Sequence, residues 1–106
     1  MITAILLGFA IGFGIGTFLD EIIKWAKDMM ALISARIKRA QVWIQRIPGA
    51  IKQFLYYMEN GNYMVKETVR PATQDEISKL RSKMNDKEWE EFSGEGTHMA
   101  NVDRAA

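Results

Sequence analysis

The side chains that could carry out catalysis are few in this sequence and form no recognisable set. His98 is the single histidine and cysteine is absent, so no Ser-His-Asp set, His/Cys metal cluster or nucleotide-binding fingerprint can be assembled. The carboxylates Glu88, Glu90 and Glu91 are typical of a solvated helix end rather than of an acid–base pair. We therefore expect a protein that is not an enzyme and that uses no metal or cofactor.

Basic and aromatic side chains are the second group with chemical potential. Residues 29–58 contain no acidic residue, although the whole chain of 106 residues has a formal net charge of only +1. Such a stretch favours contact with anionic lipid headgroups or with a protein partner. Contact with nucleic acid is the less favoured alternative, because the whole chain is close to neutral. The candidate contact residues are Lys24, Trp25, Arg36, Lys38, Arg39, Trp43 and Arg46.

The segment that must position these residues is predicted to be one amphipathic helix over residues 20–47. No proline or glycine interrupts it before Pro48, and its apolar residues follow a helical period. The stripe would pack against copies or partners, hold the helix flat on the anionic inner leaflet, or cover a small soluble core. Its central members are Ile33, Ile37, Ile44 and Ile47.

The preceding residues 1–19 contain no charged side chain. As a helix, the apolar run at 2–19 would be roughly 27 Å long, close to the ~30 Å hydrocarbon core of a bilayer. The run therefore predicts a single transmembrane helix, with a cleaved signal peptide or a buried helix of a soluble protein as competing interpretations. Because basic residues follow the run and none precedes it, we expect the N-terminus outside and the C-terminus in the cytoplasm.

Small residues recur every four positions within this apolar run, at Ala4, Gly8, Gly12 and Gly16. That spacing places them on one stripe of a helix, where small side chains permit close helix contact in lipid. The pattern predicts oligomerisation through this stripe. A ring of such helices around a lumen is the alternative arrangement.

A small hairpin-plus-helix region is predicted over residues 48–92. Asn60-Gly61 is typical of a type I′ hairpin turn and would place Glu59 opposite Asn62, with a further amphipathic helical stretch over residues 49–58 as the alternative. Thr73 and Glu76 have the spacing of a capping box, which predicts the start of a short helix. Residues 93–106 are expected to form a polar tail with little apolar surface to bury.

Together these segments predict a mainly α protein with one N-terminal transmembrane helix, a long amphipathic helix, a small β-hairpin and a short C-terminal helix. The leading functional hypothesis is a non-enzymatic, single-pass membrane subunit that oligomerises and anchors a larger assembly, such as a membrane-containing virion or a bacterial envelope complex. The first alternative is a homo-oligomeric channel, pore or membrane-disrupting effector. The second is a peripheral regulator held at an anionic membrane.

Overall fold

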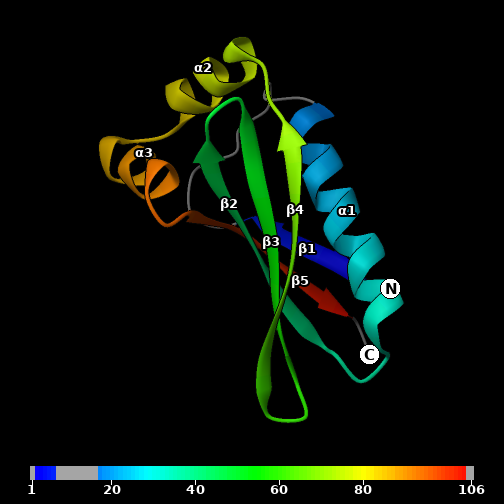
Figure 1. Cartoon of the computed structure of the whole chain (residues 1–106). Helices are drawn as coiled ribbons and strands as arrows, with labels where there is room; N and C mark the ends of the chain where they lie inside the picture. Colours follow the sequence, from blue (N-terminus) through cyan, green and yellow to red (C-terminus); the bar gives the residue numbers. More distant parts are fainter. Residues whose placement is uncertain (1, 7–16, 105–106) are drawn as a thin grey trace.

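The computed structural model describes residues 2–6 and 17–104, which form an antiparallel sheet with three helices (Figure 1). Within these residues the sheet has five strands in the order β1-β5-β2-β3-β4. The elements in chain order are β1 (Ile2–Leu6), α1 (Thr17–Ile33), β2 (Arg39–Ile47), β3 (Ala50–Glu59), β4 (Asn62–Pro71), α2 (Gln74–Lys83), α3 (Asp86–Ser93) and β5 (Thr97–Arg104).

The prediction of a mainly α fold is wrong, because the expected helix over residues 20–47 ends at Ile33. Ser34 closes it: its hydroxyl accepts a hydrogen bond from the Arg36 amide at 3.1 Å, and its carbonyl accepts one from the Ile37 amide at 3.2 Å. The chain then continues as β2, in which buried and more exposed side chains alternate. A short apolar run satisfies a period of two as well as a helical period, so the pattern alone does not separate the two structures.

The prediction of a transmembrane helix over residues 1–19 is also wrong. Residues Ile2–Leu6 form strand β1, which pairs with β5 and places Ala4 opposite Val102. Across residues 2–6 and 17–104, no helix combines the length and apolar character needed to span a bilayer. Apolar composition is shared by membrane helices and buried strands, which is why the run was ambiguous. Gly8, Gly12 and Gly16, the remaining members of the small-residue stripe, lie outside the described residues.

Strand β1 and the end of α1 at Ile33 contradict all three membrane hypotheses. A single-pass subunit, a helical channel and the predicted membrane topology each require a transmembrane helix, whereas Ile2–Leu6 form a strand and no helix among the described residues could span a bilayer. The peripheral regulator requires one continuous basic amphipathic helix, and α1 supplies only the half that ends at Ile33.

The expected polar tail instead supplies an internal strand of the sheet. β5 lies between β1 and β2, and its side chains Met99, Ala100 and Val102 are completely buried. Few other residues of the segment 93–106 are apolar. The neighbouring strands therefore provide most of the apolar surface against which this segment packs. The two distant ends of the described chain thus meet in one ladder.

One face of the sheet is covered by helices. Ile22, Ala26 and Met30 of α1 are fully buried in the same core cluster as Val42 of β2 and Leu55 of β3. Figure 1 shows α1 running alongside the sheet and α2 and α3 gathered at one end. Burying each large apolar side chain contributes about 1.5–3 kcal/mol, so this face carries the main stabilisation of the domain. The buried residues of α2 and α3 that join the cluster are Ile77, Leu80 and Phe92.

The hairpin and the capping box have the predicted local geometry. Glu59 pairs with Asn62, and the turn residues Asn60 and Gly61 have φ angles of 52° and 80°. Thr73 caps α2, with both reciprocal capping-box hydrogen bonds present. The β3–β4 hairpin projects past the other strands at the end opposite α2 (Figure 1), and β4 forms one edge of the sheet.

Candidate functional site

The sheet face opposite α1, which we call the open face, carries the largest group of aromatic side chains in the described chain. The strand registers place Trp43 opposite Phe54, and Tyr56 opposite both Gln41 and Val65. The residues directly before and after each of these in its strand point to the opposite, covered face of the sheet. The open face therefore presents side chains from β2, β3, β4 and β5 that no helix covers in the part of the chain described.

Four rings on the open face contact one another in a continuous run. His98 stacks on Trp43 with centroids 5.3 Å apart, and Trp43 meets Tyr56 edge-on at 6.1 Å. Tyr56 in turn stacks on Phe54 at 5.8 Å. Aromatic pairs in these geometries add about 0.5–1.5 kcal/mol beyond their buried area, so the run is a rigid, preformed surface.

A β-bulge places His98 in this run. The register between β2 and β5 shifts between Val42 and Trp43, so that Val42 faces Ala100 while Trp43 faces His98. The extra residue, Met99, turns into the core and is completely buried. Bulges re-aim side chains in this way, and here the shift brings a polar ring onto the open face beside the tryptophan.

A hollow of about 360 Å³ lies beside the aromatic run, towards the hairpin turn. Tyr56, Met58 and Tyr63 form its apolar and phenolic wall, and Gln41 and Asn101 supply amide groups. Tyr63 is 82% exposed, although large aromatic side chains are normally covered in a domain of this size. The hollow thus offers apolar contact area and hydrogen-bonding groups to a molecule that settles on it.

The charges around the open face balance. Two basic residues, Arg39 and Lys52, and two acidic residues, Glu67 and Asp103, lie on it. The Arg39 Nε atom is 3.8 Å from an Asp103 carboxylate oxygen. The Arg39 side chain is 87% exposed, so this ion pair contributes little to stability. A surface of this kind lacks the excess of positive charge that binding to a phosphate backbone requires.

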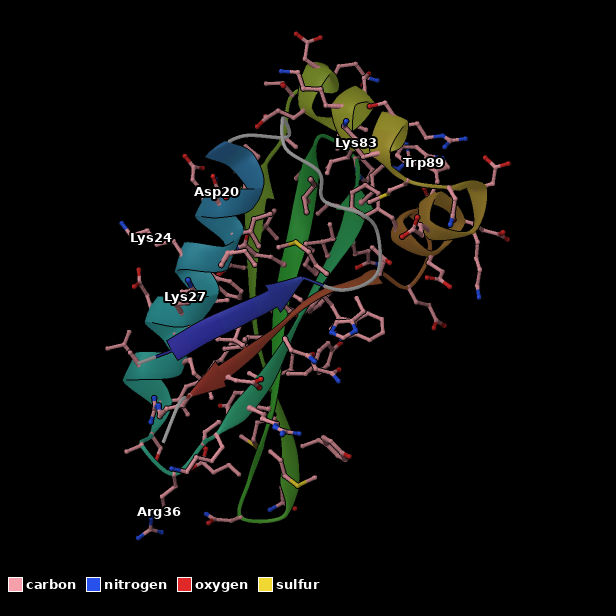
Figure 2. The ribbon with its side chains drawn as sticks, turned by 180° about the vertical axis from the view of Figure 1, so that it is seen from behind. Asp20, Lys24, Lys27, Arg36, Lys83 and Trp89 are labelled. Atoms are coloured by element: carbon pink, nitrogen blue, oxygen red, sulfur yellow. The ribbon has the colours of Figure 1, made fainter. Side chains whose placement is uncertain are left out.

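The predicted contact residues are divided between several surfaces. Lys24 projects from α1 away from the sheet, and Arg36 points outward from the loop that follows α1 (Figure 2). Trp25 is half-buried against the core, and Lys38 is exposed just before β2. Trp25 and Trp43, which a continuous helix would have aligned, lie on opposite sides of the sheet.

The remaining predicted residues lie on β2 or in the core. Arg39 and Trp43 belong to the open face, whereas the Arg46 guanidinium lies 4.5 Å from the ring centre of Trp89 on α3. The four isoleucines of the predicted stripe do not form one stripe. Ile37 and Ile44 are buried, and Ile33 and Ile47 are half-buried.

The sequence reasoning missed most of the open face. The turn at Asn60-Gly61 predicts the register that places Met58 opposite Tyr63 and Tyr56 opposite Val65, and the structure has this register. Trp43 joins these residues through the pairing of β2 with β3, in a segment predicted to be helical. His98 had no such signal, because its position depends on the β-bulge and on the pairing of β5 with β2.

A second hollow, of about 440 Å³, lies between the β2–β3 turn and the start of α2. Arg46, Gln74 and Ser93 supply its polar lining, and none of the residues that line it is aromatic. Among the described residues, no group of His, Asp and Glu side chains is arranged to hold a metal ion. The open face is therefore the stronger candidate.

No protein-family model matches this chain, and no curated protein or solved structure compared with it gives a significant match. Its function is therefore inferred from the residues of the open face.

Proposed function

We propose that this chain is a non-enzymatic protein-interaction module that binds a protein segment on the open face of its sheet. The observation that carries the proposal is the combination of a stacked aromatic run with a neighbouring hollow lined by Tyr56, Met58 and Tyr63. Tyrosine, tryptophan, methionine and arginine are the residues enriched where proteins bind one another.

The chemistry of the face favours a polypeptide over a nucleic acid. Its charged groups balance. Gln41 Oε1 accepts a hydrogen bond from Trp43 Nε1 at 3.1 Å and Asn101 Oδ1 lies 3.0 Å from His98 Nε2, which leaves the side-chain amide N–H groups to donate to the carbonyl oxygens of a peptide. Aromatic rings already fixed by their neighbours lose little conformational entropy when a partner covers them. The hollow beside Tyr63 fits an apolar side chain of such a segment.

Selection from a phage-displayed random peptide library tests the proposal. We expect peptides selected on the wild-type chain to bind the Tyr56→Ala variant at least about tenfold more weakly, because truncating a central aromatic residue of an interface costs ~2 kcal/mol or more. Lys24→Ala is the control, since Lys24 is exposed on α1, on the other side of the sheet (Figure 2).

Two results would contradict the proposal. The first is a failure to select any peptide whose binding depends on Tyr56. The second is tight binding of an oligothymidylate that is lost in Trp43→Ala, which would identify the aromatic run as a stacking platform for single-stranded nucleic acid.

A further inference from the structure

Strand β4 is exposed along almost its whole length. Seven large hydrophobic side chains are markedly exposed in that part of the chain, and four of them belong to β4. Long apolar edge strands are normally shortened, charged or covered, because they template pairing with another strand. The exposed apolar residues of β4 are Tyr63, Met64, Val65 and Val69.

The backbone of β4 is arranged to accept another strand. In a two-residue hairpin the residues flanking the turn form the first hydrogen-bonded pair, and such pairs then alternate along the ladder. Glu59 and Asn62 flank this turn, so Tyr63, Val65 and Glu67 direct their N–H and C=O groups away from β3. Pro71, which has no N–H group, stands only at the far end of the strand.

We infer that the occupant of this edge is β4 of a second copy of the chain, paired antiparallel about a two-fold axis through Val65. This inference rests on the proposed role of the open face in binding protein. Charge disfavours two registers on the C-terminal side of Val65: an axis through Lys66 would place lysine opposite lysine, and an axis through Glu67 would place glutamate opposite glutamate. The axis through Val65 places valine opposite valine and Tyr63 opposite Glu67.

The covered side of the edge supports the same register. A hollow of about 340 Å³ lies between α1 and the hairpin, lined by Met29, Leu32 and Lys66 among others. Leu32 is a large apolar residue of this helix and is 78% exposed. With the axis at Val65, Met64 of the second copy falls opposite Lys66 and reaches this hollow. A flexible methionine fits such an irregular apolar site.

Pairing in this way produces a continuous sheet with two open faces side by side. The axis uses the β4 edge of both copies, so the association closes at a dimer through this interface. Tyr63 and the hollow beside it then lie next to the junction, which gives the proposed protein-binding surface twice its single-copy extent.

Cysteine cross-linking and sedimentation test the inference on the full chain. The natural sequence contains no cysteine, so an introduced thiol is unique. In Val65→Cys the two Cα atoms would be ~5.5 Å apart across the axis, within the range of a disulfide. We expect rapid disulfide-linked dimer under mild oxidation, and a dimer of the wild-type chain in analytical ultracentrifugation.

Val69→Cys is the matched control, because Val69 lies on the same strand and face and is 53% exposed against 47% for Val65. In the proposed register two Val69 residues are roughly 27 Å apart, from ~3.4 Å per residue, so this variant should not cross-link. A second variant, Val65→Lys, should raise the dimer dissociation constant about tenfold or more by placing like charges opposite each other.

The inference is overturned if the wild-type chain sediments as a monomer up to sub-millimolar concentration, or if Val69→Cys cross-links as fast as Val65→Cys. A monomeric chain that still binds Tyr56-dependent peptides would overturn the dimer and leave the proposed function standing. A dimer with the predicted cross-link that selects no peptide would do the reverse.

Discussion

Gln53 is a polar side chain in the middle of an apolar core, with 1% of its surface exposed. Arg70 satisfies it, donating a hydrogen bond from Nε to the Gln53 Oε1 atom at 3.3 Å. The same guanidinium donates from a terminal nitrogen to Glu21 of α1 at 2.5 Å. These contacts join β3, β4 and α1, so Arg70 connects the exposed hairpin to the covered face.

At this scale we predict that Arg70→Met lowers the free energy of unfolding by about 1–3 kcal/mol, because it leaves a buried amide oxygen without its donor. Glu21→Gln should cost less than about 1 kcal/mol, since that ion pair is partly exposed. Urea denaturation measures both. The double variant Gln53→Leu/Arg70→Met should regain part of the loss. A single Arg70→Met variant as stable as the wild type would contradict the assignment.

At the scale of elements, the β3–β4 hairpin depends on its turn. Gly61 has a φ of 80°, and an added Cβ atom would meet nothing within 4 Å. The cost of Gly61→Ala is therefore conformational rather than steric, and we predict a loss of about 1–2 kcal/mol. Asn60→Gly serves as the control and should change stability by less than about 0.5 kcal/mol, because glycine adopts positive φ freely. Urea denaturation measures the free energy of unfolding of both variants, and equal m-values would show that the comparison reports stability alone. Equal destabilisation by both variants would show that the turn geometry is not limiting.

The contrast between this hairpin and β2 shows what local sequence determines. Asn60-Gly61 and the Thr73–Glu76 capping box set their geometry through contacts a few residues apart, so the hairpin register and the start of α2 were predictable. β2 and β5 acquire their structure from pairing with strands remote in sequence. Residues 39–47 carried no decisive local signal, and the placement of Trp43 on the open face follows only from that distant pairing.

At the scale of the whole molecule, the sheet has one face covered by helices and one open face. The three helices pack against the covered face, while the open face and the sheet edge formed by β4 are accessible in the described chain. Composition and net charge did not reveal this asymmetry, because the aromatic residues of the open face are far apart in the sequence, from Trp43 to His98. Only the alternation of side chains across paired strands gathers them on one face.

The antiparallel pairing of β1 with β5 has a mechanical consequence. Ile2 lies directly opposite Arg104, so a force applied between these two residues loads the ladder at one end and opens its hydrogen bonds one after another. Force applied between Ile2 and Glu95, which precedes β5, instead acts along the strands and loads the bonds together. In optical-tweezers experiments with handles at these positions, we predict that the first geometry opens at clearly lower force. Similar rupture forces in both directions would be inconsistent with this strand pairing.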